Sequence, residues 1–149
     1  KAHAKVPRER AFDSVLPIDL PQVFTGYGPL PAVVGTELFD NAWNAAGQSR
    51  RIDLSDGNHA IESLNSFQRP SHFGYRIDQF SGPLGSFVDH ADGEWSFTEN
   101  GEGTDIQWSY TWVPKTIGIP VIWIVAQLWQ PYADRIVKRC AIVAEQEAS

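Results

Sequence analysis

Large apolar residues alternate with polar ones over residues 104–113, and this is the most regular pattern in the chain. The apolar positions are two residues apart: Ile106, Trp108, Tyr110 and Trp112. A period of two predicts a β-strand with these side chains on one face and the polar ones on the other. The same alternation places Trp95 and Phe97 of the preceding strand on this aromatic face, and Tyr75 and Ile77 extend it.

Strand-like segments fill the middle of the chain. They cover residues 33–39, 49–54, 60–69, 73–80, 86–98 and 104–113. Asp56-Gly57 and Asn100-Gly101 favour tight hairpins, because such pairs readily take the positive φ of primed turns. Residues 81–85 form a longer loop. Successive strands joined by short turns pair antiparallel.

Helical and strand-like segments also precede this region. Residues 8–16 carry apolar side chains at helical spacing and follow a proline, which is tolerated at the start of a helix. Residues 20–25 predict a second short helix, and residues 3–6 predict a short strand before both helices.

The chain after Pro114 is predicted to be helical to its end. Its apolar residues recur at three- and four-residue steps: Trp129, Ala133, Ile136, Val137, Cys140, Val143 and Ala144. Such a stripe predicts a helix packed on the rest of the fold. Pro131 removes a backbone hydrogen bond, so we expect either a kink or two helices meeting at that point.

Four local sequences add a family resemblance to this order of elements. They are VPRERAF at residues 6–12, FGYRI at 73–77, GEWSFT at 93–98 and GTDIQW at 103–108. Together with the helix pair, the strand meander and the long last helix, they resemble the START-like or SRPBCC superfamily, which includes polyketide cyclases and dehydrases and lipid-transfer proteins. The resemblance covers the chain as one START-like domain, residues 1–149, and a length of 149 residues agrees with one domain.

The resemblance implies an α+β helix-grip fold. In that fold a seven-stranded curved antiparallel sheet surrounds the long C-terminal helix, and two short helices follow the first strand. A hydrophobic cavity lies between the sheet and the helix. Because the superfamily contains both binding proteins and enzymes, the resemblance narrows the architecture more than the activity.

Nine side chains are candidates for contact with a ligand in this cavity. They are Tyr75, Ile77, Trp95, Phe97, Trp108, Tyr110, Ile122, Val125 and Trp129. Tyrosine and tryptophan carry polar groups that a dry core would have to satisfy, whereas a cavity supplies water or ligand as partners. The alternative is that these rings form ordinary core and that Ile122, Trp123, Val125 and Trp129 fill the space.

Composition excludes several classes of partner and location. A net charge of −6 disfavours nucleic acid, because binding a phosphate backbone needs clustered lysine and arginine. The single cysteine excludes an intrachain disulfide, and the polar N-terminus lacks the apolar core of a secretory signal, so we expect a cytoplasmic protein. Residues 116–133 carry no charge, but Gly118 and Pro120 interrupt the apolar run, so we expect a buried helix and no transmembrane segment.

Candidate catalytic and metal-ligating groups are few. His90 lies among carboxylates in the sequence DHAD at 89–92, a setting that suits proton transfer. Strand parity places it on the face opposite Trp95 unless Gly93 forms a bulge. The other histidines lack the spacing of metal ligands, and no phosphate-binding or dinucleotide-binding motif is present. We therefore assign no catalytic residue, no metal and no cofactor.

Four charged residues lie within the predicted central strands: Glu62, Arg69, Arg76 and Asp78. A charged side chain on the inner face costs free energy unless it is paired or touches a polar ligand group. Parity places Arg76 and Asp78 on the outer face, where we expect a salt bridge, whereas the neighbours of Glu62 leave its face unassigned. Cys140 lies on the apolar helix stripe, where we expect a buried and unreactive thiol.

These patterns favour the binding or carrying of an apolar small molecule, such as a lipid, a polyketide or an aromatic metabolite. A first alternative is an enzyme of the cyclase, aromatase or dehydratase type that uses the same cavity. A second alternative is a membrane-surface or protein-interaction module that exposes residues 117–129 as an apolar patch. The oligomeric state stays open between a monomer and a homodimer.

Overall fold

One antiparallel sheet and a long C-terminal helix make up most of the computed structural model, which describes residues 1–115 and 119–147. The elements follow in the order β1 (Ala2–Ala4), α1 (Arg8–Val15), α2 (Leu20–Val23), β2 (Val33–Leu38), β3 (Ser49–Leu54), β4 (His59–Gln68), β5 (His72–Asp78), α3 (Leu84–Phe87), β6 (Val88–Asn100), β7 (Gly103–Pro114) and α4 (Ile119–Glu147). The seven strands pair antiparallel in the order β1-β7-β6-β5-β4-β3-β2.

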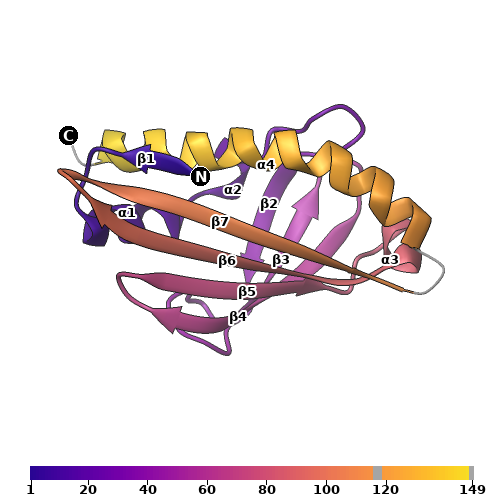
Figure 1. Ribbon diagram of the computed structural model, residues 1–149. Coiled ribbons are helices and arrows are strands. Elements are labelled where there is room, and N and C mark those ends of the chain that lie inside the picture. Colours follow the sequence, from indigo (N-terminus) through magenta and orange to yellow (C-terminus); the bar gives the residue numbers. More distant parts are fainter. Residues whose placement is uncertain (116–118, 148–149) are drawn as a thin grey trace.

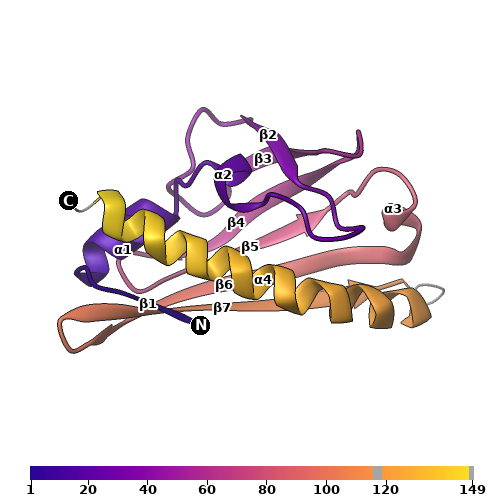
Figure 2. The ribbon, with the colours of Figure 1, turned by 90° about the horizontal axis from the view of Figure 1, so that it is seen from above.

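Helix α4 covers one face of this sheet. Figure 1 shows the sheet curving beneath α4, and Figure 2 shows α4 extending along the sheet from α1 toward α3. The two short helices α1 and α2 follow the first strand. The α+β helix-grip fold expected from the sequence is therefore confirmed.

The predicted strands agree with the structure apart from small shifts at their ends. The first strand spans Ala2–Ala4 instead of residues 3–6. The loop predicted at residues 81–85 includes the start of a single helical turn, α3, so β6 begins at Val88 rather than at residue 86. Pro83 precedes this turn with helical dihedral angles, because its ring fixes φ near the helical value.

The β6–β7 hairpin confirms the aromatic face. The tight hairpin expected here is present, but its two-residue loop is Gly101-Glu102 rather than Asn100-Gly101, because Asn100 pairs with Gly103 as the last residue of β6; Gly101 takes a φ of 65° at the first loop position. The resulting register sets Trp95 opposite Trp108. Because side chains alternate along each strand, the large residues of both strands lie on the face that α4 covers.

Helix α4 is one continuous helix that contains Pro131. Of the two alternatives expected at this proline, a kink or two helices, the structure has no break into two helices within Ile119–Glu147, and Figure 1 shows the first half of α4 bending toward α3. Proline removes one backbone hydrogen bond without ending the helix here, because packing on both sides of it holds the remaining turns. Within the described residues, no helix is long and apolar enough to cross a membrane.

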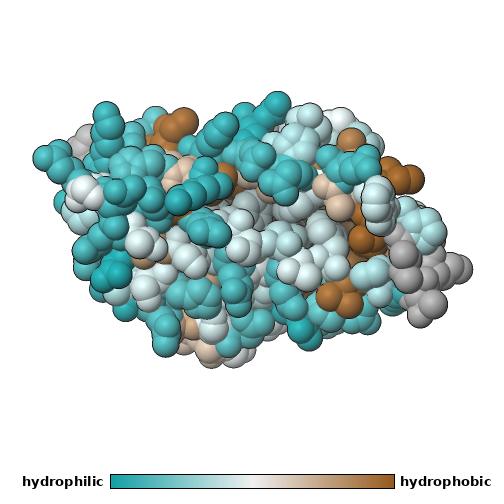
Figure 3. Space-filling view, in the orientation of Figure 1, coloured by the Kyte–Doolittle hydropathy of each residue, from teal (hydrophilic) through white to brown (hydrophobic). Residues whose placement is uncertain are grey.

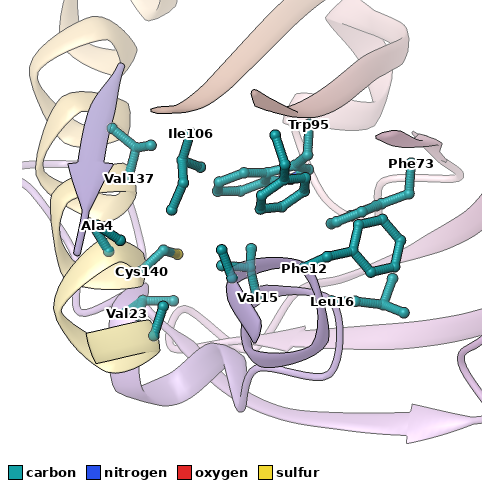
Figure 4. Close-up of a cluster of buried hydrophobic side chains, with 14 of the residues drawn as sticks. Ala4, Phe12, Val15, Leu16, Val23, Phe73, Trp95, Ile106, Val137 and Cys140 are labelled. Atoms are coloured by element: carbon teal, nitrogen blue, oxygen red, sulfur yellow. The ribbon is translucent and has the colours of Figure 1, made fainter. Parts of the chain in front are cut away.

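A cluster of buried side chains joins α1, α4 and the sheet (Figure 4). Phe12 is fully buried and meets the rings of Phe67, Phe73 and Phe97 edge-on, at centroid distances of 5.5, 5.6 and 5.3 Å. Edge-to-face pairs of this kind stabilise a core beyond their area of burial. Cys140 of α4 belongs to the same cluster, and burial raises the pKa of its thiol to about 12, which agrees with the expected unreactive thiol.

Candidate ligand-binding site

A cavity of about 290 Å³ lies between the sheet and α4. Strands β2 to β7 contribute one wall, and α4 and the loop 24–32 contribute the opposite wall. Apolar and aromatic side chains dominate the lining, and a few polar groups interrupt it. This composition is typical of small-molecule sites, whose volumes are roughly 300–1,000 Å³.

Six of the nine candidate ligand-binding residues line this cavity: Tyr75, Ile77, Trp95, Tyr110, Val125 and Trp129. The other three are not part of its wall. Phe97 is 2% exposed within the core cluster. Trp108 stacks on Trp95 at a centroid distance of 4.8 Å, and Ile122 is half-buried elsewhere on α4. The role of all nine in binding stays a prediction.

The start of α4 leaves the cavity open. Val125 and Trp129 face the cavity, whereas Trp123 and Ile124 point outward, with 71% and 64% of their surface exposed. The apolar run at residues 122–129 is therefore divided between the two faces of the helix. The outward residues cannot fill the space that the inward ones enclose.

Arg50 and Glu62 form an ion pair inside the cavity. They are direct partners on β3 and β4, and Nη2 of Arg50 donates to Oε1 of Glu62 at 2.9 Å. Both side chains are buried, and the guanidinium lies 4.1 Å above the ring of Trp43. Desolvation raises the pKa of Glu62 above its ordinary value, and the charge of Arg50 acts in the opposite direction.

Tyr75 and Tyr110 lie in the row of cross-strand partners next to the row that contains Arg50 and Glu62. Tyr75 and Tyr110 both pair with Gly93, which lies between them on β6. A Cβ on Gly93 would lie 2.3 Å from Cζ of Tyr75, so only glycine leaves room for this ring. Burial raises the pKa of both hydroxyls, and both therefore stay protonated at neutral pH.

The hydroxyl of Tyr75 has a free proton to donate. Nε1 of Trp108 donates to the oxygen of Tyr75 at 2.9 Å, so this hydroxyl acts as an acceptor in the one hydrogen bond that it makes among the described residues. The indole nitrogens of Trp112 and Trp129 are buried without a hydrogen-bond partner in the described part of the chain. Both tryptophans line the cavity, so its wall includes buried N–H donors without an acceptor in that part of the chain.

Tyr132 of α4 holds the loop 24–32 over the cavity. Its hydroxyl accepts from the backbone N–H of Gly26 at 3.0 Å and donates to the carbonyl of Pro31 at 3.2 Å. Arg139 also donates to the hydroxyl of Thr25. Because this loop carries part of the cavity lining, these contacts link α4 to the cover of the cavity.

The carboxylates around His90 lie on the outer face of the sheet. His90 contacts Asp89 at 2.6 Å and Asp92 at 3.5 Å. The register shift in β6 falls between Val88 and His90, not at Gly93, so His90 and Trp95 stay on opposite faces. The group proposed for proton transfer is therefore remote from the cavity.

Two arginines also have carboxylate partners on the outside. Arg76 bonds Asp92 across β5 and β6 at 2.8 Å, so the outward salt bridge expected for Arg76 and Asp78 is present for Arg76, with Asp92 rather than Asp78 as its partner. Arg69 bonds Asp13 at 2.7 Å in an exposed position. Among the described residues, no group of three or more histidine, cysteine or acidic side chains is placed to hold a metal ion.

Among the polar residues of the site, Arg50 was not a candidate from the sequence, and Glu62 was a candidate whose face was unassigned. Arg50 and Arg51 are adjacent on β3, and the strand separates their side chains: Arg51 bonds Asp53 outside, and Arg50 turns inward. The alternation with Ile52, two residues along on β3, is the signal that places Arg50 on the cavity face.

Comparison with known proteins defines the fold. No protein-family model matches the chain, and no curated protein matches its sequence. Among solved structures, TTHA0849 from Thermus thermophilus is 17% identical and has a TM-score of 0.69, with 99% of this chain and 96% of that chain covered. The structure of Ara h 8.0201 is also similar, at 12% identity and a TM-score of 0.62, with 98% of this chain and 92% of that chain covered.

A third similar structure is the di-domain ARO/CYC StfQ from the steffimycin biosynthetic pathway. It is 15% identical with a TM-score of 0.65, and the alignment covers 99% of this chain but 44% of that chain. At these identities the similarity shows a shared fold and leaves the activity of the chain open.

Proposed function

Because the chain has the START-like, or SRPBCC, fold, we propose that the protein binds an apolar small molecule in the cavity between the sheet and α4. The observation that carries this proposal is an open apolar cavity with a few polar groups on its wall. Protein interiors are ordinarily packed without voids of this size. The ARO/CYC domain named above belongs to a biosynthetic pathway, which supports a small organic molecule as the ligand.

A pair of tryptophan substitutions on α4 tests this proposal. Val125 lines the cavity and Ala126 beside it is exposed, so Val125→Trp fills the cavity while Ala126→Trp adds the same side chain outside. The proteins are purified, extracted under denaturing conditions and analysed by mass spectrometry. We expect a co-purified small molecule in the wild type and in Ala126→Trp and its loss from Val125→Trp. Equal amounts in all three would contradict the proposal.

The position of Glu62 favours an enzyme of the cyclase or dehydratase type as a second candidate function. Glu62 is a titratable group inside the cavity, with a raised pKa and a charged partner, Arg50. A carboxylate in this position can take a proton from a carbon beside a carbonyl group and return one from solvent.

Deuterium exchange measures this step without a known substrate. The methyl protons of 2-acetylnaphthalene exchange slowly in D2O, and mass spectrometry follows the exchange with and without protein. An enzyme would accelerate it, and Glu62→Gln would abolish the acceleration. A rate equal to that in buffer would leave binding as the function.

Contact with a membrane surface is the third candidate. Trp123 and Ile124 are exposed on the charge-free half of α4, and Figure 3 shows hydrophobic surface gathered at the end of the molecule where α4 begins. An amphipathic aromatic ring of this kind suits the interface of a bilayer. Co-sedimentation with phosphatidylcholine vesicles should be weaker for Trp123→Glu than for the wild type. Equal partitioning of the two proteins removes this candidate.

A further inference from the structure

Four polar side chains converge on one part of the cavity wall. Arg50 and Glu62 belong to the row of the sheet that continues through Ile77, and Tyr75 and Tyr110 belong to the row beside it. Tyr75 and Tyr110 have ring centroids 6.4 Å apart, and all four side chains line the cavity. We call Arg50, Glu62, Tyr75 and Tyr110 the polar cluster.

The polar cluster offers no free positive charge. The guanidinium of Arg50 is already bonded to Glu62 and lies over Trp43. Among the described lining residues, Arg50 is the only arginine or lysine, whereas Glu62 and Asp56 are both acidic. An anionic ligand would therefore lose its hydration and meet a carboxylate without gaining a cation of its own.

The polar cluster offers hydrogen-bond donors instead. The hydroxyl of Tyr75 accepts from Trp108 and keeps its proton free, and the hydroxyl of Tyr110 makes no hydrogen bond within residues 1–115 and 119–147. Nε of Arg50 is also buried without a partner among these residues. The two tyrosine hydroxyls are uncharged donors, and such donors match the oxygen of a carbonyl, hydroxyl or ether group.

The volume and the aromatic lining of the cavity also restrict which ligands fit. Its volume of about 290 Å³ is at the lower end of the range for small-molecule sites, which is too small for a lipid with two acyl chains. The rings of Tyr110 and Trp129 are part of its lining, and aromatic rings pack favourably against an aromatic ligand.

We propose that the polar cluster selects an uncharged aromatic molecule that carries a carbonyl or hydroxyl oxygen and rejects a carboxylate of the same size. This inference rests on the proposed function and names the class of ligand for it. The two tyrosine hydroxyls donate to the oxygen of the ligand, and the carboxylate of Glu62 repels an anionic group.

Three probes of nearly equal size test this selectivity by equilibrium dialysis at pH 8. They are 2-acetylnaphthalene, which has an uncharged acceptor, 2-naphthoate, which is an anion, and 2-ethylnaphthalene, which has no acceptor. We expect the ketone to bind about tenfold or more tightly than the anion. We expect it to bind about threefold to tenfold more tightly than the hydrocarbon.

Two variants assign the selectivity to the polar cluster. Tyr110→Phe should reduce the advantage of the ketone over the hydrocarbon, because a donor is lost. Glu62→Gln should raise the affinity for 2-naphthoate about tenfold, because the charge of Arg50 is then uncompensated. Glu94→Gln makes the same change on the outer face of the sheet and should alter no affinity.

The possible outcomes distinguish a failure of the proposed ligand class from a failure of the proposed function. If 2-naphthoate binds the wild type as tightly as the ketone, the ligand class is wrong and the proposed function stands. If none of the three probes binds, the proposed function fails and the ligand class fails with it. If Glu62→Gln does not fold, the affinities of the three probes for the wild type and for Tyr110→Phe are sufficient to test whether the polar cluster selects the ketone.

Discussion

Nη2 of Arg50 lies 2.9 Å from Oε1 of Glu62, and both side chains are buried on facing strands beside the cavity. Burying two charges is costly, and their mutual attraction repays this cost only when both partners are present. The pair therefore contributes little net stability, but it places two polar groups inside an apolar cavity.

Removing one partner of this pair should cost more than removing both. Glu62→Leu leaves the guanidinium of Arg50 buried without its counterion, and we expect a loss of about 3–5 kcal/mol in the free energy of unfolding. The double variant Arg50→Met/Glu62→Leu should recover most of this loss. Urea denaturation measures both. A double variant as unstable as the single one would contradict the account.

Gly93 should not tolerate a side chain. A Cβ at this position would lie 2.3 Å from Cζ of Tyr75, so Gly93→Ala must displace the ring, at a cost of about 1–3 kcal/mol. Gly35→Ala is the matched control, because a Cβ there meets Asp53 only at 3.8 Å. Thermal unfolding compares the two. An equal effect of both substitutions would mean that Tyr75 does not need the space above Gly93.

The hydroxyl of Tyr132 should control the loop over the cavity. Tyr132→Phe removes the hydrogen bonds to Gly26 and Pro31, and we expect a loss of about 1–2 kcal/mol together with faster hydrogen exchange in residues 24–32. Tyr27→Phe is the control, because its hydroxyl makes no hydrogen bond within the described residues and its ring stacks on Tyr132. Unchanged exchange in Tyr132→Phe would show that other contacts hold the loop.

The salt bridge of Asp92 with Arg76 should contribute stability only while Asp92 is ionised. The hydrogen bond from Arg76 lowers the pKa of Asp92 below its ordinary value of 3.8. The unfolded chain therefore binds a proton first as the pH falls, and the contribution is present above pH 3.8 and is lost below it.

Asp92→Asn measures this contribution. Because the pair is partly exposed, we expect the wild type to exceed the variant by about 0.5 kcal/mol at pH 7 and by less at pH 3. Asp19→Asn, at an exposed position without a side-chain cap hydrogen bond, is the matched control. A difference between wild type and Asp92→Asn that is constant with pH would contradict the assignment.

The fold was predictable because its main signals are periodic. The two-residue alternation at Ile106 and Trp108 and the helical stripe that includes Ile136 each define a buried face without reference to any other element. Their combination requires a sheet that packs on a helix. The structure confirms both faces, with Ile106 and Ile136 fully buried.

The polar part of the site was not predictable in the same way. Ile61 is apolar and lies on the outer face, and a register shift after Leu64 changes the parity of β4, so the pattern around Glu62 is mixed. The openness of the cavity depends on which way Trp123 and Val125 point. That direction follows from the packing of α4 as a whole, which a sequence pattern does not determine.

The most direct test of the central claim locates a bound molecule by NMR. Isotope-filtered NOEs from 2-acetylnaphthalene to the protein report which side chains it contacts. We predict NOEs to the methyl groups of Ile77 and Val125 and to the ring of Tyr110, all of which line the cavity. NOEs confined to the exposed side chains of Val34 and Ile124 would place the molecule on the surface and contradict the account.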